Sequence, residues 1–403
     1  MIKICDMNPY TTKNSIQFAK KVFPVSNINE YLWNDSLTKS NWNISDSFNI
    51  QSNYYISLQT SAFLVGMNAI QLNYQERFNL GKTLDDILIS CAFNMRNCNK
   101  TNDFEYFIDS TYGNCIRFNS GYNIYNKSVE LKKTTQTGPI GGLILELLLD
   151  PINQDSLFSI FRGYNVIITE QGVDVTFSSG ALVSPGYYYN IHLERQITSY
   201  PPRPYSNCTD NLDSVDSHDS DLYKKTFQSK SNYNQKDCIL LCYNKYVEET
   251  CNCSNPAFIP YHNAKIKCLT PETISCQLEA YQKFTLIYNS DSCDCPQKCK
   301  IISYTYKSSM LEYPTIDYAK SLMKNQMIMK KLNKTQLTFD DIKQNVVAIN
   351  IFYNQNIETS VEAQIKTDFI SLISNIGGIM GLFLGKLILI NLQAFYKTIK
   401  LNN

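Results

Sequence analysis

The sequence has little charge of either sign and few histidine or tryptophan residues. Charged residues make up 18% of the 403 residues, Lys and Arg (37) nearly balance Asp and Glu (36), and there are three histidines and two tryptophans. Without a basic excess or a basic cluster of groove size, the composition argues against nucleic-acid binding. The sequence also lacks the G-x-S-x-G and H-E-x-x-H motifs and a convincing carboxylate pair, so we expect no enzyme.

Apolar runs long enough to cross a membrane are absent from residues 1–368. The stretch GGLILELLLD (141–150) is short and is interrupted by Glu146, which predicts a buried strand or core segment. The chain also begins MIKICDMNPY, with no apolar signal sequence. A membrane span is therefore expected only farther along.

Residues 369–392 form such a span, because Lys386 is the one charge in a run long enough to cross a bilayer with some tilt. Lys397 and Lys400 follow it, so the positive-inside bias predicts a cytoplasmic C-terminus and places the preceding residues outside. A single span at this end does not by itself carry those residues across. Either the topology differs or a first span is missing; we expect the latter, with Ile2 and Ile4 as its tail.

Cysteine is abundant, with 14 residues, ten of them between 208 and 299. Zinc is the competing explanation, but structural zinc sites usually repeat C-x2-C or add histidine at short spacing, and neither pattern occurs here. The spacing predicts disulfides and an oxidising compartment. Seven N-x-S/T sequons agree weakly with a glycoprotein: Asn34, Asn43, Asn99, Asn126, Asn207, Asn252 and Asn333. A cysteine directly follows the asparagine at 207 and 252, which makes these two poor acceptors.

Periodicity predicts both strands and helices. Residues 164–177 contain β-rich runs around a glycine turn, and residues 346–354 alternate as a core strand that leads toward the membrane run. Residues 83–94 and 315–333 have helical spacing. The acidic segment 210–221 lacks the glycine and terminal glutamate of an EF-hand loop, so a solvated loop is favoured over a cation site.

The order of these features resembles the degenerin/epithelial sodium channel superfamily, which includes acid-sensing and peptide-gated channels. The motifs that carry the resemblance are ICDMNP (4–9), GNCIRFNSG (113–121), SPGYYYNIHL (184–193), PPRPYSNC (201–208), YNQKDCILLCYNKYVEETCNCSNPAFIPY (233–261), CDCPQKCKIISYTYKSSMLEYP (293–314), NVVAINIFYN (345–354) and LISNIGG (372–378). In this order they are highly specific.

The resemblance implies an α+β fold. A disulfide-rich extracellular domain with a palm β-sheet, β-ball, finger, thumb and knuckle would cover residues 1–368, with the thumb at about 208–310. A second transmembrane helix with gate and selectivity region would follow at 369–396, and a short cytoplasmic tail at 397–403. The first transmembrane helix would be the part missing from this chain.

The resemblance also implies which cysteines pair. The implied pairs are Cys5 with Cys115, Cys91 with Cys98, Cys208 with Cys299, Cys238 with Cys295, Cys242 with Cys293, Cys251 with Cys276, and Cys253 with Cys268. Spacing alone leaves very many connectivities open. The bridges could serve only stability, or the thumb bridges could in addition make a stiff lever that transmits ligand binding to the pore.

The same resemblance places functional residues near the membrane. Tyr205 would couple the thumb to the first span, although it could equally be a tyrosine in a proline-rich turn. The gate region would comprise Ser374, Asn375, Gly377, Gly378 and Gly381. The glycines could instead serve only close helix packing.

The expected selectivity filter is Gly385, Lys386 and Leu387, where the superfamily has Gly-x-Ser with a small middle residue. Only the glycine matches, and Gln393 stands at a usually acidic position. The backbone near Gly385 is expected to open and turn carbonyls toward ions. Three lysines at a narrow point would repel cations, although Lys386 could also snorkel, lie between subunits or titrate.

The implied function is a subunit of a trimeric, ligand- or proton-gated, amiloride-sensitive sodium channel of the plasma membrane. The expected partners are other channel subunits in a homo- or heterotrimer, the lipid bilayer and an extracellular proton or peptide ligand, with no nucleic acid. Sodium would be the permeant ion, with no cofactor and no resident metal. The alternative is a non-conducting or regulatory subunit, or a truncated copy, because the filter triplet reads Gly-Lys-Leu.

Overall fold

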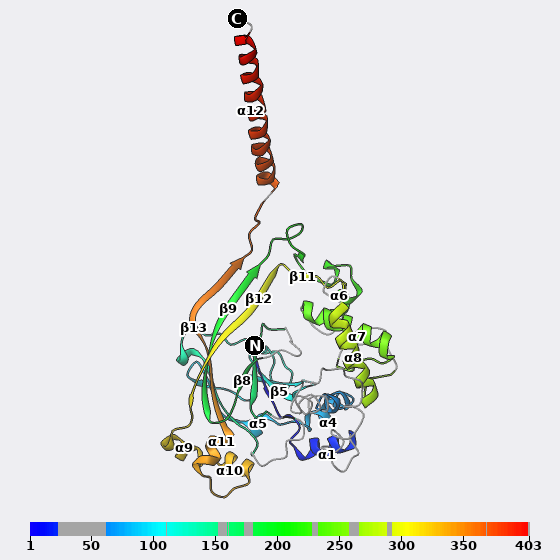
Figure 1. Ribbon diagram of the computed structural model, residues 1–403. Helices are drawn as coiled ribbons and strands as arrows, with labels where there is room; N and C mark the ends of the chain where they lie inside the picture. The colour runs from blue at the N-terminus through cyan, green and yellow to red at the C-terminus, as the bar shows by residue number, and fades with distance from the viewer. Residues whose placement is uncertain are drawn as a thin grey trace, which may run out of the picture.

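The computed structural model contains a mixed α and β head domain and one long helix, α12 (Phe369–Leu401), that projects away from it (Figure 1). We call residues 1–367 the head. The structure describes residues 1–22, 62–109, 111–151, 159, 161–172, 180–227, 233–257, 266–287, 292–367 and 369–401.

Two β-sheets make up the centre of the head. A five-stranded sheet has the order β4-β5-β1-β7-β8, and a six-stranded sheet has the order β12-β9-β13-β6-β2-β3. Neighbouring strands in both sheets are antiparallel except β9 and β13, which are parallel. The strands of the first sheet are β1 (Ile2–Asp6), β4 (Phe104–Asp109), β5 (Gly113–Phe118), β7 (Tyr164–Ile168) and β8 (Ala181–Val183). Those of the second are β2 (Leu88–Phe93), β3 (Arg96–Asn97), β6 (Leu143–Leu148), β9 (Tyr187–Ser199), β12 (Lys300–Glu312) and β13 (Val346–Glu362).

The two sheets share one hydrophobic core. Ile4, Ile116 and Val166 of the five-stranded sheet belong to the same buried cluster as Leu145 and Ile349 of the six-stranded sheet, and each is at most 2% exposed. Burial of this much apolar surface is the main favourable term in folding. Strands β1 and β13 therefore pack into the same core.

Helices lie on one side of the sheets and at the end of the head far from α12 (Figure 1). Those near the N-terminal half are α1 (Lys13–Val22), α4 (Tyr74–Phe78), α5 (Leu84–Ile87) and the 3-10 turn η1 (Pro139–Gly141). A cysteine-rich unit contains β10 (Cys208–Thr209), η2 (Val215–Ser217), α6 (Asp221–Thr226), α7 (Gln235–Cys251), α8 (Pro271–Ile287) and β11 (Gln297–Lys298). Toward the C-terminal end of the head sequence lie α9 (Ile316–Leu322), α10 (Gln326–Leu332) and α11 (Phe339–Asn345).

Most elements expected from periodicity are present. The strand expected within 141–150 is β6, and the strand expected at 346–354 begins β13. The helical spacing of 315–333 corresponds to α9 and α10. The β-rich stretch 164–177 contains β7, and its second half falls outside the described residues.

The prediction of a helix at 83–94 is wrong beyond the first helical turn. Thr83 and Asp86 form a capping box that begins α5, but the chain becomes extended at Leu88 and continues as β2. Strand β2 pairs with the buried strand β6, and the Cys91–Cys98 disulfide closes its hairpin. Tertiary pairing has overridden a weak local helix preference.

All 14 cysteines form disulfides, so the zinc explanation does not apply to them. The bonds are Cys5–Cys115, Cys91–Cys98, Cys208–Cys299, Cys238–Cys295, Cys242–Cys293, Cys251–Cys276 and Cys253–Cys268. These are the seven pairs that the superfamily resemblance implied. Five of them lie in the cysteine-rich unit, where they compensate for a small hydrophobic core around α7 and α8.

Candidate pore helix and its connection to the head

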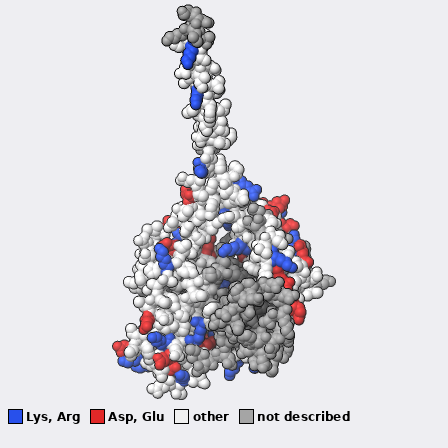
Figure 2. Space-filling view, in the orientation of Figure 1, with Lys and Arg blue, Asp and Glu red and all other residues white. Residues whose placement is uncertain are grey.

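Helix α12 is long and apolar enough to cross a membrane. The candidate span Phe369–Lys397 has 29 residues, a mean hydropathy of 1.8 and no part buried against the head. At a rise of 1.5 Å per residue it is about 44 Å long, which exceeds the ~30 Å hydrocarbon core of a bilayer. Figure 2 shows that the surface of this helix carries no charge apart from a few separate basic side chains.

Small residues follow one face of α12. Ser374, Gly378, Gly381 and Gly385 are separated by four, three and four residues, which is the spacing of one helix face. Apart from the adjacent residues and the backbone of α12 itself, no described atom lies within 4 Å of a Cβ built on any of the three glycines. This face is therefore open to another helix.

Polar residues follow the neighbouring face of the same helix. Asn375, Lys386 and Gln393 are separated by eleven and seven residues, which is about three and two helical turns. The predicted gate residue Asn375 and the predicted filter residue Lys386 thus share a face, and Leu387 lies about 100° farther round the helix. The expected filter triplet does not point to one side.

The backbone of α12 continues as a helix through Gly385. The opening expected there is not a feature of this structure. An opened helix would leave carbonyl groups without partners unless other helices, water or ions replace them. Local opening at this position remains a prediction for an assembled pore.

Strand β13 connects the core to α12. Its first seven residues, 346–352, are buried in the six-stranded sheet, whereas residues 354–362 are exposed and extend beyond the core. Strand β9 stays paired with it across a register shift between Tyr353 and Glu358, and Arg195 of β9 forms an ion pair with Glu358. Five described residues, 363–367, then lead toward α12 (Figure 1).

The cysteine-rich unit joins these strands at the end nearest α12. The Cys208–Cys299 bond fastens the unit directly before β12. Tyr200 N donates to Cys299 O at 2.8 Å, and Ala363 N donates to Ser199 O at 2.9 Å. A short series of covalent and hydrogen bonds therefore runs from the Cys208–Cys299 disulfide to the segment that precedes α12.

Tyr205 lies in the turn between β9 and β10. This turn follows the end of β9 that is nearest α12 (Figure 1). The amide of Tyr205 donates to Pro202 O at 3.1 Å, and its side chain is 48% exposed. The exposed ring is available for a contact outside the head.

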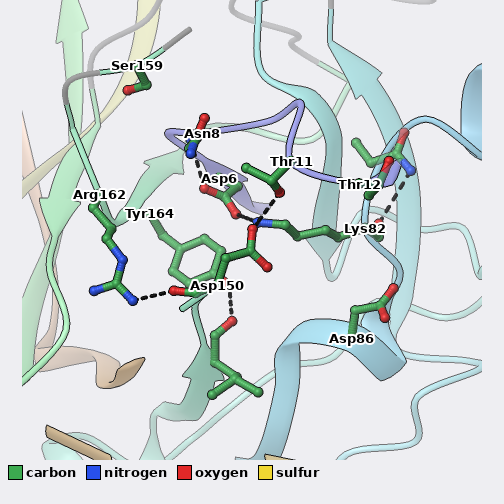
Figure 3. A network of polar contacts seen from close by, with 12 residues as sticks. Asp6, Asn8, Thr11, Thr12, Lys82, Asp86, Asp150, Ser159, Arg162 and Tyr164 are labelled. Carbon is green, nitrogen blue, oxygen red and sulfur yellow. Dashed lines mark hydrogen bonds and ion pairs between the residues drawn. The ribbon is translucent and has the colours of Figure 1, made fainter. Parts of the chain in front are cut away.

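A buried network of charged residues joins the two sheets (Figure 3). Lys82 Nζ lies between Asp6 Oδ2, at the end of β1, and Asp150 Oδ2, after β6, and forms ion pairs with both. Thr11 Oγ1 also donates to the Asp150 carboxylate, and Arg162 donates to the Asp150 carbonyl.

The network extends to the start of β13. Arg162 donates to Asn345 Oδ1 and to Gln344 O, both at 2.5 Å. Lys331 of α10 lies 3.4 Å from Asp86 and 3.9 Å from Asp150 Oδ1. Strand β1 and strand β13 are thus held by the same set of polar contacts.

Burial raises the pKa of Asp6 above its ordinary value, and Asp150 acts in the same direction while Lys82 opposes it. Burial alone would lower the pKa of Lys82, but the two carboxylates together raise it, so the lysine stays charged. The cations Lys82, Lys331 and Arg162 balance Asp6, Asp86 and Asp150 in number. Such a balance offsets the cost of burying the charges.

Another buried carboxylate, Glu146 of β6, lies outside this network and is 7% exposed. The hydroxyls of Tyr313, Tyr318 (2.7 Å) and Ser90 (2.6 Å) all donate to it. These bonds tie α9 to the six-stranded sheet. Sequence reasoning noticed Glu146 only as an interruption of an apolar run.

Sequence reasoning also missed the network around Lys82. Its one visible signal was that Asp6 and Asp150 directly follow apolar runs that become β1 and β6. The lysine that balances them is 76 residues from Asp6 in sequence and gives no local pattern.

The acidic segment 210–221 is a mostly exposed loop with the short turn η2. His218 Nε2 lies 3.0 Å from Asp294, and Lys298 pairs with Asp213. Among the described residues, three or more His, Cys, Asp or Glu side chains are nowhere arranged to hold a metal ion. The geometry agrees with a solvated loop.

Comparisons with known proteins identify the family. The model of the amiloride-sensitive sodium channel family matches residues 1–389. Acid-sensing ion channel 4-B of Danio rerio is 29% identical over 326 residues, which cover 78% of this chain and 51% of that relative. Acid-sensing ion channel 1 of Gallus gallus is 25% identical over 420 residues (99% and 70%), and degenerin unc-8 of Caenorhabditis elegans is 26% identical over 344 residues (82% and 40%).

The chain spans about half the length of the first of these relatives. The family match itself covers the whole head and most of α12. It is a family of ion channels, which agrees with the expectation of a non-enzyme. The chain belongs to the amiloride-sensitive sodium channel family.

Proposed function

We propose that this chain is a subunit of a trimeric, ligand- or proton-gated, amiloride-sensitive sodium channel in the plasma membrane. The head would be extracellular and the C-terminus cytoplasmic. The observation that carries the proposal is the family match over residues 1–389, which includes the head, its connection to α12 and most of that helix. Sodium would be the permeant ion.

In this proposal α12 lines the pore. The open face with Ser374, Gly378, Gly381 and Gly385 would allow three helices to approach closely. Asn375 would contribute to the gate on the adjoining face. Close packing in lipid needs small side chains because burial of apolar surface gives little drive there.

The route from the head to the pore would be β13. Movement of the cysteine-rich unit would reach α12 through the Cys208–Cys299 bond and the hydrogen bonds of Tyr200 and Ala363. Tyr205 would provide a second contact, from its exposed turn to a membrane segment. The network around Lys82 would keep the buried first part of β13 fixed, so that only its exposed part, nearer α12, moves.

Assembly into a trimer is supported by apolar side chains on the exposed strands. Tyr306, Met310 and Leu311 of the edge strand β12 are 36–66% exposed, and Ile357 and Val361 of β13 are 62% and 43% exposed. An unprotected edge strand with apolar side chains is a typical contact surface. Neighbouring subunits would cover it.

Lys386 decides whether the subunit conducts. Three ammonium groups near a pore axis would oppose sodium by several kcal/mol in a weakly screened environment. A lysine that points between subunits or toward the membrane surface would not. The alternative function, a non-conducting or regulatory subunit, depends on the first arrangement.

Whole-cell recording of the full-length gene product tests the proposal. The wild type, Lys386→Ala with Leu387→Ser, and the charge-preserving Lys386→Arg would be compared across pH and with amiloride. Amiloride-blocked sodium current in the wild type supports a conducting subunit. Current only in the double variant shows a silent subunit with a working gate. If none of the three conducts although all reach the surface, the channel proposal fails for the homomeric protein.

A further inference from the structure

We propose that Asn99 and Asn126 carry N-linked glycans that together cover one exposed corner of the head. The proposal rests on the proposed extracellular position of the head, because the glycan donor acts in the secretory lumen. The donor is an oligosaccharide attached to a lipid through a diphosphate. The two sites follow from the geometry of two loops that the proposed channel function does not use.

The sequon Asn99-Lys100-Thr101 lies in the turn between β3 and β4, and all three residues are exposed. Asn99 Oδ1 accepts from Thr101 N at 3.0 Å and from Thr101 Oγ1 at 2.6 Å. The side-chain amide nitrogen takes part in neither bond. The hydroxyl and the amide of the sequon thus already lie together, and the nitrogen is left on the solvent side.

The sequon Asn126-Lys127-Ser128 lies at the tip of a small loop and is also exposed throughout. Asn126 has a φ of 57°, and its backbone amide donates to Asn123 O at 2.9 Å. Asn123 Oδ1 accepts hydrogen bonds from Tyr125 N and Lys127 N, both at 3.0 Å. The buried Asn123 side chain thus holds the backbone of the loop in place. The loop therefore presents the Asn126 side chain away from the head.

The two loops are neighbours in space although 27 residues separate the asparagines. Ile124 N donates to Thr101 O at 3.2 Å, so the first sequon touches the loop that carries the second. Two large aromatic side chains of this loop are exposed, Tyr122 at 48% and Tyr125 at 67%. Glycans on the two asparagines would shield these two rings from solvent.

The other described sequons differ in whether the residues after the asparagine are buried or exposed. The residues that follow Asn207 and Asn252 are the buried, disulfide-bonded Cys208 and Cys253, and Ser254 is itself buried. A glycan there would have to fit beside a closed disulfide. Asn333 is open, at the end of α10 with a φ of 52°, and serves as a reference site.

The reaction at each site is a glycosyl transfer. The asparagine amide nitrogen bonds to C1 of the first sugar, and the bond from C1 to the diphosphate oxygen breaks. The lipid diphosphate leaves with the electron pair of that bond, and the amide nitrogen loses one proton. Oxidants and reductants are not needed.

The test is site mapping on the full-length protein purified from secretory eukaryotic cells. Enzymatic removal of N-glycans in ¹⁸O-water converts each glycosylated asparagine to ¹⁸O-labelled aspartate, which mass spectrometry locates. We expect label at Asn99 and Asn126 and none at Asn207 or Asn252. Thr101→Ala and Ser128→Ala should each remove one glycan, while Thr101→Ser and the neighbouring Asn102→Gln should retain both.

A second measurement separates this inference from the proposed function. Surface biotinylation of head lysines on intact cells reports whether the head is outside. If the head is outside but Asn99 and Asn126 are unlabelled, the glycan inference is overturned and the channel proposal stands. If the head is inside, both fail. With both glycans removed by Ser128→Ala and Asn99→Gln, we expect stronger binding of an apolar dye to the purified protein than with Asn102→Gln.

Discussion

Removal of the Cys208–Cys299 disulfide should loosen the connection between the cysteine-rich unit and the strands that lead to α12. In the chain-entropy account, a disulfide stabilises by closing a loop in the unfolded chain. The bond spans 91 residues, but Cys238–Cys295 already closes 57 of them, so that 91 minus 57, or 34, remain. A loop of this length corresponds to about 3.8 kcal/mol at 25 °C.

A matched control is the Cys253–Cys268 bond, which lies in the same unit but far from β12. Its 15-residue loop lies within the 25-residue loop of Cys251–Cys276, so that 25 minus 15, or 10, residues remain. The same relation gives about 2.7 kcal/mol. Replacing either pair by serine should therefore lower the free energy of unfolding, by about 1 kcal/mol more for the first pair.

The assay is urea unfolding of the full chain in lipid nanodiscs, followed by near-ultraviolet circular dichroism. The protein has 28 tyrosines, so this signal reports mainly on packing in the head. Hydrogen exchange gives the local readout. The amides of Tyr200 and Ala363, which donate to Cys299 O and Ser199 O, should exchange faster only when Cys208 and Cys299 are replaced.

Two results would refute this reasoning. Equal protection of the Tyr200 and Ala363 amides in the two variants would show that the disulfide does not organise this end of the head. A larger loss of stability in the Cys253–Cys268 variant would show that loop closure does not govern these bonds. Neither result would leave a reason to think that Cys299, directly before β12, links the cysteine-rich unit to the strands that lead to α12.

Four further substitutions probe the polar contacts inside the head. Lys82→Met should cost about 3–5 kcal/mol of stability in thermal unfolding, because two buried carboxylates lose their shared cation, and adding Asp150→Asn should restore part of it. Tyr318→Phe should cost about 1.5 kcal/mol by the same assay, since one of three donors to Glu146 is lost; an unchanged midpoint would contradict the assigned bond. Hydrogen bonds from Thr83 and the nearby Lys331 outweigh burial and lower the pKa of Asp86, so its contribution to stability is present above its unfolded pKa of about 4 and is lost as pH falls through the folded value. Asp86→Asn should therefore destabilise the protein at pH 7, and in denaturant titrations the difference from the wild type should shrink as the pH falls below the unfolded pKa.

Several conclusions depended only on the sequence. Fourteen cysteines without zinc-type spacing predicted disulfides, and the run 369–392 predicted a helix able to span a membrane. The alternating residues at 346–354 predicted the core strand that leads to this helix. Such properties are local, because composition, hydropathy and short-range periodicity carry them. The motif order added the family and the cysteine pairing, which spacing alone left open.

Tertiary structure decided what local patterns could not. Residues 88–93 have helical spacing but form β2, because the buried strand β6 pairs with Leu88 and, after a register shift, with residues 90–93. Nothing in the sequence around Lys82 marks it as a partner of the two aspartates. Only the tertiary fold places it between Asp6 and Asp150. The two sequons at Asn99 and Asn126 become neighbours only when their loops meet in the folded head. Each of these features depends on contacts between residues far apart in the chain, and a one-dimensional pattern does not record them.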